Sequence, residues 1–274
     1  MSSDITLVKN YWNSRPCNVM HGTSPRNTCQ YYDEVAQKRY KAEPHILNFI
    51  NPSNWSGKFV LELGCGIGTD AIQFARAGAR VVCVDLTENG IDMCKKNFEL
   101  HGLNGEFYVG NIETLDNILP ADYKNKFDLI YSFGVIHHTV KPKQVFDNIP
   151  NFLNDNGEFR CMLYSKFSYK LFWVMHETNS WKLKDSEELI QYYSEAQTGC
   201  PITHTYTFDE IRNLISPNME ITNIWKDHVF IWDIDSYKKN LFVVDKAFEN
   251  VDETFMSALK SELGWHTLFV AKKV

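Results

Sequence analysis

Residues 60–70 read Val-Leu-Glu-Leu-Gly-Cys-Gly-Ile-Gly-Thr-Asp, an apolar run that ends in three glycines separated by one residue each. The apolar residues that follow, Ala71, Ile72, Phe74 and Ala75, have helical spacing. The stretch therefore predicts a strand, a tight glycine loop and the start of a helix. Glycines there permit backbone angles that other residues resist, and they let a ligand lie against bare main chain. The amides of the loop and of the helix start would face an anionic group above them.

A second apolar run, residues 80–85, ends in Asp85, which lies 17 positions after Gly68. A carboxylate at the end of the second strand is placed to accept hydrogen bonds from both hydroxyls of a ribose. The glycine spacing differs from the G-x-G-x-x-G of dinucleotide-binding folds, since it reads E-x-G-x-G-x-G from Glu62. A nucleoside-containing ligand is therefore expected, bound by another variant of the glycine loop.

Four segments in order, residues 61–68, 82–85, 109–113 and 127–132, together resemble the class I S-adenosylmethionine-dependent methyltransferases. The resemblance covers residues 55–163 and indicates a small-molecule type without identifying a subfamily. It implies an α/β fold with a doubly wound, mostly parallel sheet of seven strands, an N-terminal helical lid and an inserted cap. It also implies S-adenosylmethionine as cofactor and S-adenosylhomocysteine as its product.

Segments in which apolar residues have strand-like spacing alternate with segments in which they have helical spacing, and this alternation supports the fold. It predicts strands at residues 58–63, 80–85, 105–109, 127–132 and 157–164, helices at 69–77, 88–101 and 142–153, a helix at 207–215 with a capping box of Thr207 and Glu210, and strands near 219–231 and at 264–272. The chain is expected to divide into a lid segment (1–54), a cofactor-binding core (55–164) and a region of cap insertions plus the final strands (165–274).

Composition limits the class of protein and its partners. The 274 residues carry a net charge of −6 with no long Lys/Arg run, which argues against a nucleic-acid partner. Seven cysteines show neither C-x-x-C nor metal spacing and favour a reducing compartment. No run approaches the roughly 18 apolar residues of a membrane span. A cytoplasmic protein without a transmembrane segment is expected; its oligomeric state stays open, with a dimer among the alternatives.

The resemblance also implies which residues bind the cofactor. The glycine loop would pass under its amino-acid part, Glu62 would orient the loop or hold the ammonium group through water, and Asp85 would bind the ribose. Asn111 and Ile112 would flank the adenine, with an Asn carbonyl able to accept from the adenine amine. The expected set is Glu62, Gly64, Cys65, Gly66, Gly68, Asp85, Leu86, Asn111, Ile112, Ser132 and Tyr31.

Two adjacent histidines, His137 and His138, follow the fourth strand, where active sites of open α/β sheets lie. An imidazole there could act as a general base toward a hydroxyl or amine acceptor. The alternative is that one of them packs under the cofactor. Adjacent residues rarely point at one ion and no acid stands beside them, so no metal is expected.

Aromatic side chains are frequent outside the core. Tyr11, Trp12, Tyr31, Tyr32 and Tyr40 precede the first strand, where they would form a lid over the cofactor or pack on the sheet. The segment 165–205 carries Phe167, Trp173, Trp181 and Tyr193, which suggest an apolar or planar acceptor, or a dimer contact.

The expected function is methyl transfer to a small or medium-sized molecule, with an aromatic, phenolic or quinone-like acceptor favoured by the aromatic residues. N- or S-methylation of a polar metabolite is an alternative, and a non-catalytic cofactor-binding regulatory or structural subunit is another. The segment that begins at Ser132 excludes some classes: it lacks the Asn/Asp-Pro-Pro-aromatic motif of amino-group DNA methylases, the two glutamates of protein arginine methylases and the acid of magnesium-dependent catechol methylases.

Overall fold

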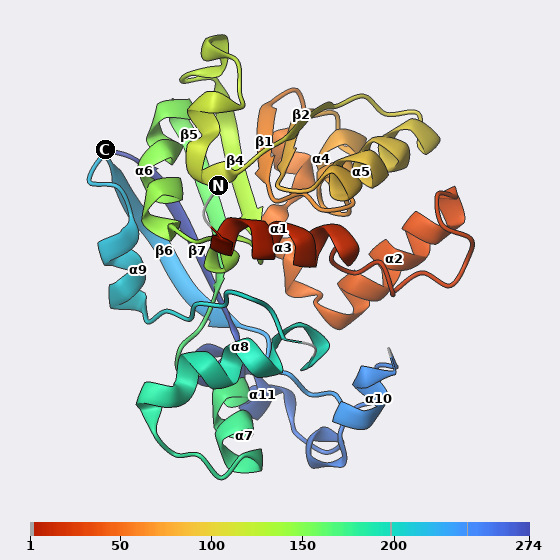
Figure 1. Ribbon diagram of the computed structural model, residues 1–274, viewed down its shortest axis with the longest axis vertical. Coiled ribbons are helices and arrows are strands. Elements are labelled where there is room, and N and C mark those ends of the chain that lie inside the picture. The colour runs from red at the N-terminus through yellow and green to blue at the C-terminus, as the bar shows by residue number, and fades with distance from the viewer. Residues whose placement is uncertain (1–2, 198, 240) are drawn as a thin grey trace.

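The computed structural model describes residues 3–197, 199–239 and 241–274. Within them, one seven-stranded sheet has the order β3-β2-β1-β4-β5-β7-β6 (Figure 1). The strands are β1 (Phe59–Leu63), β2 (Arg80–Asp85), β3 (Glu106–Val109), β4 (Phe127–Phe133), β5 (Leu153–Tyr164), β6 (Met219–Asp227) and β7 (His266–Lys273). Strands β1 to β5 pair in parallel, and β7 runs antiparallel to both β5 and β6. The predicted seven-stranded, mostly parallel sheet is confirmed.

Helices cover both faces of this sheet because its strands are apolar on both sides. Successive residues of a strand point to opposite faces: Leu61 and Leu63 of β1 belong to one core cluster, and Val60 to the other. The first cluster lies under α6 (Pro142–Phe152) and α9 (Phe208–Leu214), the second under α3 (His45–Ile50), α4 (Ala71–Arg76) and α5 (Glu88–Leu100).

The fifth strand begins earlier than the sequence pattern predicts, at Leu153 instead of residue 157. Leu153 pairs with Phe127 and Glu158 with Leu129, so the residues between them bulge out of the ladder. Asn156 and Gly157 fall inside this bulge. A Cβ at Gly157 would come within 2.7 Å of the Phe127 carbonyl oxygen, which explains the glycine. The predicted strand near 219–231 is also too long, since β6 ends at Asp227.

In the described residues, three α-helices precede β1: α1 (Ser3–Ser14), α2 (Cys29–Ala42) and α3. Pro44 precedes the first residue of α3 and separates it from α2. Helix α1 crosses the carboxyl ends of the strands (Figure 1), tied to α5 by hydrogen bonds from Asn89 to the side-chain and main-chain oxygens of Asn13. The N-terminal segment therefore covers the edge of the sheet where ligands bind in such folds.

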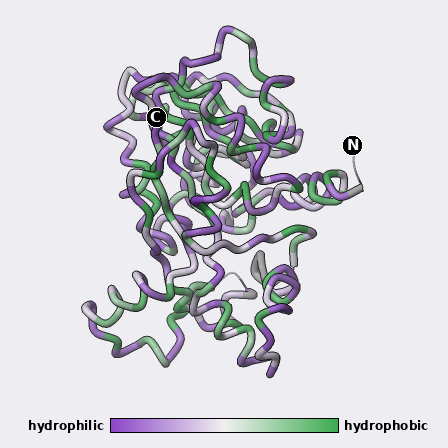
Figure 2. The backbone as a smooth tube through the Cα atoms, turned by 90° about the vertical axis from the view of Figure 1, so that its left-hand side faces the viewer, coloured by the Kyte–Doolittle hydropathy of each residue, from purple (hydrophilic) through white to green (hydrophobic). Residues whose placement is uncertain are grey.

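A second group of helices forms a cap at the other end of the molecule, at the bottom of both Figure 1 and Figure 2. It consists of α7 (Tyr169–Glu177), α8 (Ser186–Gln197), α10 (Ile234–Lys238) and α11 (Glu253–Leu263). These helices come from the two insertions on either side of α9 and β6. The capping box predicted at Thr207 and Glu210 is present at the start of α9. No described helix is long and apolar enough to cross a membrane.

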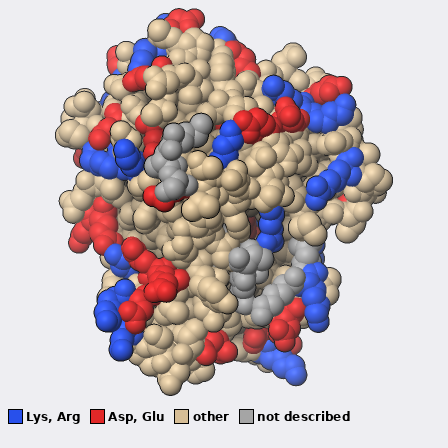
Figure 3. All heavy atoms as spheres, in the orientation of Figure 1, with Lys and Arg blue, Asp and Glu red and all other residues tan. Residues whose placement is uncertain are grey.

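Short 3-10 turns complete the described chain: η1 (Pro52–Trp55), η2 (Ile112–Asn117), η3 (Ala121–Tyr123), η4 (Ile136–His138), η5 (Leu183–Asp185) and η6 (Lys246–Phe248). Two of them, η2 and η4, follow β3 and β4 and lie beside the cavity described below. On the face seen in Figure 3, acidic and basic side chains are interspersed around a broad uncharged area in the middle of the molecule.

Candidate active site

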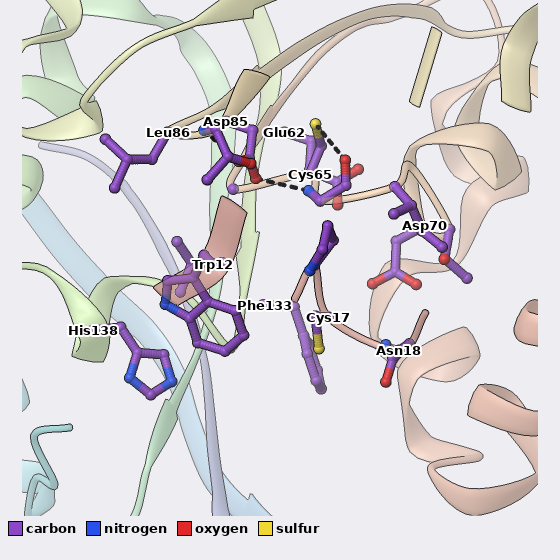
Figure 4. A pocket seen from close by; sticks show the side chains of 18 of the residues that line it. Trp12, Cys17, Asn18, Glu62, Cys65, Asp70, Asp85, Leu86, Phe133 and His138 are labelled. Atoms are coloured by element: carbon purple, nitrogen blue, oxygen red, sulfur yellow. Dashed lines mark hydrogen bonds between the residues drawn. The ribbon is translucent and has the colours of Figure 1, made fainter. Parts of the chain in front are cut away.

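A cavity of about 230 Å³ opens at the carboxyl ends of β1, β2 and β4, between the sheet, α1 and the cap (Figure 4). Nine of the residues predicted from the sequence line it: Glu62, Gly64, Cys65, Gly66, Asp85, Leu86, Asn111, Ile112 and His138. Four predicted residues do not: Gly68, Ser132, His137 and Tyr31. The parallel strands thus bring residues from four loops to one place.

The three glycines of the loop have positive φ angles, +75° at Gly64, +51° at Gly66 and +77° at Gly68, which favour glycine. A Cβ at Gly64 would lie 2.4 Å from Val135, and one at Gly68 would lie 2.5 Å from the Cys94 sulfur. These two glycines permit close packing. A Cβ at Gly66 would meet no atom within 4 Å, so this glycine leaves the cavity wall open for a ligand to approach the main chain.

Asp85 ends β2 and holds the glycine loop. Its Oδ2 accepts from the Gly66 amide at 2.9 Å, and its Oδ1 accepts from the Thr87 amide at 2.9 Å and from the Thr87 hydroxyl at 2.7 Å. Burial raises the pKa of Asp85, while these hydrogen bonds oppose the rise. A carboxylate has about four acceptor positions. Three of these positions are used here, so Asp85 can accept from about one further donor without losing a hydrogen bond that it already makes.

Glu62 lies in the floor of the cavity and is 4% exposed. Its Oε2 is buried and has no hydrogen-bond partner among the described residues. Burial and then the charge of Asp70 raise the pKa of Glu62 well above its usual range. An unpaired buried carboxyl is costly, so a cationic or polar donor brought by a ligand would stabilise it.

Arg39 and Asp70 form a buried ion pair at the cavity that sequence reasoning did not anticipate. The Arg39 guanidinium from α2 lies 3.0 Å from the Asp70 carboxylate, which also accepts from the Tyr40 and Tyr131 hydroxyls. The feature of the sequence that could have pointed to Asp70 is its position directly after the glycine loop, at the start of α4.

On the far side of the loop, Leu86 and Ile112 provide apolar surface beside Asp85. Asn111 precedes η2, and its Oδ1 accepts from the Glu113 amide at 3.0 Å. The oxygen expected to accept from an adenine amine therefore already caps a helical turn, although a carbonyl oxygen has a second lone pair.

His138 lines the cavity from η4, beside the indole of Trp12 at a ring-centroid distance of 5.2 Å (Figure 4). Its Nδ1 lies 2.6 Å from the carbonyl oxygen of Ile202. A carbonyl only accepts, so the neutral ring carries its proton on Nδ1 and its lone pair on Nε2. This arrangement suits a proton acceptor.

His137 is fully buried and lies outside the cavity lining. Its ring stacks on Tyr164 at 3.7 Å, and neither ring nitrogen has a hydrogen-bond partner among the described residues. Burial lowers the pKa of His137 well below its usual value. The packing interpretation therefore fits His137, and only His138 is placed to meet a ligand.

Ser132 and Tyr31 are also buried away from the cavity. The Ser132 hydroxyl donates to the Leu63 carbonyl at 3.2 Å, which ties β4 to β1. The Tyr31 hydroxyl donates to the Val19 carbonyl at 2.8 Å within a small apolar cluster. Each side chain thus supports a segment near the cavity without reaching into it.

The remaining wall is aromatic and comes from four separate elements: Trp12, Phe133, Tyr164 and Tyr237. The aromatic residues singled out in segment 165–205 lie elsewhere. Phe167 and Trp181 are half exposed, and Trp173 lines a separate pocket of about 40 Å³. Glu43 and His266 also line the cavity, and none of the sequence motifs described above pointed to either.

Comparisons with known proteins agree with this geometry. A family model described as a methyltransferase domain matches residues 55–229. Ubiquinone biosynthesis O-methyltransferases are 31% identical over 101 residues in Actinobacillus pleuropneumoniae serotype 5b (strain L20) and 32% identical over 102 residues in Coxiella burnetii (strain RSA 493 / Nine Mile phase I). The matches cover 37% of this chain and 43% and 42% of those proteins, so the chain spans less than half the length of these relatives.

Solved structures show the same fold at low sequence identity. Geranyl diphosphate C-methyltransferase from Streptomyces coelicolor A3(2) has a TM-score of 0.62 at 13% identity, over 100% of this chain and 99% of that one. Magnesium protoporphyrin IX methyltransferase from Synechocystis PCC 6803 has a TM-score of 0.59 at 14% identity, over 99% and 100% of the chains. Its structures hold S-adenosylhomocysteine or S-adenosylmethionine.

The family model covers more than half of the chain, and the strand order and antiparallel β7 match the expected topology. The chain therefore belongs to the methyltransferase-domain family, with the fold of the class I S-adenosylmethionine-dependent methyltransferases.

Proposed function

We propose that this protein transfers a methyl group from S-adenosylmethionine to a small acceptor that carries a hydroxyl or reactive ring carbon on a planar, aromatic or quinone-like body. The observation that carries the cofactor half is the convergence of Glu62, Gly66 and Asp85 on one cavity. The acceptor half rests on the aromatic wall and on His138. The relatives named for ubiquinone biosynthesis support the same acceptor class.

The residues present fit the cofactor. The buried, unpartnered Oε2 of Glu62 would accept from its ammonium group, and the open main chain at Gly66 would lie against its amino-acid part. Asp85 would accept from a ribose hydroxyl, with Leu86 and Ile112 as apolar contacts for the adenine. When bound, S-adenosylmethionine supplies a methyl group on a cationic sulfur, open to in-line displacement.

His138 would take the proton of the acceptor. Its Nδ1 is held by the Ile202 carbonyl, so Nε2 presents the lone pair that a hydroxyl proton needs. The aromatic wall would orient the acceptor, and most of the acceleration would come from alignment of acceptor and methyl group. N- or S-methylation of a polar metabolite remains the alternative, and it would need no base at this position.

The first experiment is a calorimetric titration of the purified protein with S-adenosylmethionine and S-adenosylhomocysteine. Asp85→Ala should weaken binding by about 1–3 kcal/mol, the range for a lost hydrogen bond to a charged group. Asp92→Ala on the exposed face of α5 is the matched control and should bind like the wild type. Equal affinity in Asp85→Ala would remove Asp85 from the site.

Binding by the wild type then permits a screen of acceptors with labelled methyl. Transfer to phenols or hydroquinones supports the proposed acceptor class, and transfer only to amines or thiols supports the alternative. Tight cofactor binding with no transfer to any acceptor, together with a stable partner protein, would favour a regulatory or structural subunit. A folded wild-type protein that binds neither cofactor nor product would contradict the proposal itself.

A further inference from the structure

Three histidines and one glutamate meet at the wall of the cavity, although they are far apart in the sequence. Glu43 follows α2, His45 begins α3, His228 follows β6 and His266 begins β7. One ligand atom from each of Glu43, His228 and His266 lies within 4.8 Å of the other two. Glu43 and His266 also line the cavity. The four residues are called the histidine cluster below.

A hydrogen bond within the cluster orients its central ring. His266 Nδ1 lies 2.9 Å from His45 Nε2, and His266 Nε2 lies 3.6 Å from the Glu43 Oε1. With the proton of His266 on Nδ1, donated to His45, the lone pair of Nε2 faces the Glu43 carboxylate. A ring nitrogen held in this way by a neighbour is the usual arrangement behind a metal-bound histidine.

Arg39 lines the same cavity as Glu43 and His266. It is paired with Asp70 at 3.0 Å, which reduces its repulsion of a cation.

The backbone at His228 is a further sign of a constrained site. Its φ is +63°, a left-handed conformation that is uncommon for residues with a side chain, although Asn, Asp and His adopt it more often than the others. The Trp265 amide donates to the His228 carbonyl at 2.7 Å and fixes the turn beside His266. In this conformation the His228 ring stacks on that of His266, at a centroid distance of 4.6 Å.

We propose that Glu43, His228 and His266 bind one divalent transition-metal ion, such as zinc, with His45 holding His266 in the ligating orientation. Two imidazoles and a carboxylate suit zinc, and such three-residue sites leave a fourth position for water or substrate. Tetrahedral bonds of about 2.1 Å would place the three ligand atoms roughly 3.4 Å apart. The His266 Nε2 and Glu43 Oε1 atoms already lie 3.6 Å apart.

The position of the site suggests its role. Glu43 and His266 line the same cavity as Glu62 and His138, so the open position of the ion faces the space assigned to the methyl acceptor. This step rests on the proposed function: an acceptor oxygen, from a phenol, hydroxyl or carboxylate, would complete the coordination. Metal binding itself rests only on the four residues and is testable without cofactor or acceptor.

A second group of side chains that could bind a metal ion must be distinguished from the histidine cluster by experiment. The thiols of Cys65, Cys83 and Cys94 also lie within 4.8 Å of one another, beneath the glycine loop. They are buried against β2 and α5, where Cys94 packs against Gly68. Thiolate and imidazole ligation differ spectroscopically, which the experiment uses.

The test is a titration of chelator-treated, tag-free protein with Co²⁺, followed by its visible absorption, and with Zn²⁺ in competition. We expect one ion per chain, tetrahedral Co²⁺ bands without thiolate charge transfer, and displacement by Zn²⁺. His228→Asn removes the imidazole while asparagine tolerates the left-handed backbone, so it should fold and bind at least tenfold more weakly. Glu43→Gln should also bind at least tenfold more weakly.

The matched control is His176→Asn, which removes an exposed histidine of α7 and should bind like the wild type. Circular dichroism and S-adenosylmethionine affinity show that each variant is folded. Absence of a bound ion in wild-type protein overturns the proposal. So does binding that survives both His228→Asn and Glu43→Gln, or that shows thiolate charge transfer, which would place the ion on the cysteines. Cofactor binding without metal binding rejects this site and leaves the proposed function standing.

Discussion

At the scale of single residues, the neighbours His137 and His138 have opposite environments. His138 reaches the cavity with its Nδ1 held by Ile202, whereas His137 is enclosed against Tyr164 with neither ring nitrogen hydrogen-bonded to a described residue. Their side chains point in different directions because they occupy successive positions of a 3-10 turn. His138 is therefore placed to contact a ligand, whereas His137 contributes to packing.

This difference predicts a contrast between two alanine variants. His138→Ala should lower turnover by about 10²–10⁴-fold if it removes a general base, with cofactor affinity close to wild type. His137→Ala should instead lower stability by about 1–3 kcal/mol, because it empties a packed position. Turnover kinetics, calorimetry and urea unfolding of both variants measure the contrast. Unchanged turnover in folded His138→Ala would leave N- or S-methylation as the better proposal.

At the scale of elements, a buried ion pair between Arg39 and Asp70 joins helix α2 to the start of α4. Arg39 and Asp70 are 9% and 3% exposed, and Asp70 also accepts from a tyrosine of α2 and from one of β4. A second ion pair joins the same helix to α4, between Asp33 and Arg76, but both partners are exposed. The two pairs offer the same chemistry at different burial.

Removing the arginine from each pair should therefore have unequal effects. Arg39→Met leaves the Asp70 charge buried and should cost about 3–5 kcal/mol of unfolding free energy. Arg76→Met, the matched control, should cost less than about 1 kcal/mol. Urea unfolding of the three proteins provides the comparison. Equal costs for the two variants would show that Asp70 is stabilised without Arg39.

At the scale of the whole molecule, buried histidines make stability depend on pH. Burial lowers the pKa of His45 and His228 to about 3, that of His21 to about 4, and those of His137 and His266 well below 6.5. Between these values and about 6.5 the unfolded chain binds more protons than the folded one, so stability rises with pH. Acidification below pH 6.5 should destabilise the protein.

The slope of the unfolding free energy against pH, compared between variants, shows which histidines contribute to it. Each one should contribute up to about 1.4 kcal/mol per pH unit between pH 6 and 4, measured by urea unfolding of metal-free protein. His45→Gln should reduce the slope by about that amount, and His176→Gln, which changes an exposed residue, should leave it near the wild-type value. A stability that stays constant from pH 7 to 4 would show that these rings are not buried in the neutral form.

The sequence alone predicted the sheet, the glycine loop and most of the cofactor side of the cavity. These features depend on local pattern: strand and helix periods, glycines at positive φ such as Gly66, and an acid at the end of β2. The topology then carries such residues to one edge, because parallel strands end together. This is why the sequence could predict that Glu62, Asp85 and Asn111 lie together at one edge of the sheet.

Only the tertiary structure decided the rest. It separated His138 from His137 and paired Arg39 with Asp70. Beside Trp12, which the sequence had singled out, it placed Phe133, Tyr164 and Tyr237 in the cavity wall instead of the expected aromatic residues of segment 165–205. It also assembled the histidine cluster from α2, α3 and the strands β6 and β7. These contacts join residues up to 221 positions apart, so no local period records them; they follow from how the lid and the antiparallel end of the sheet pack together.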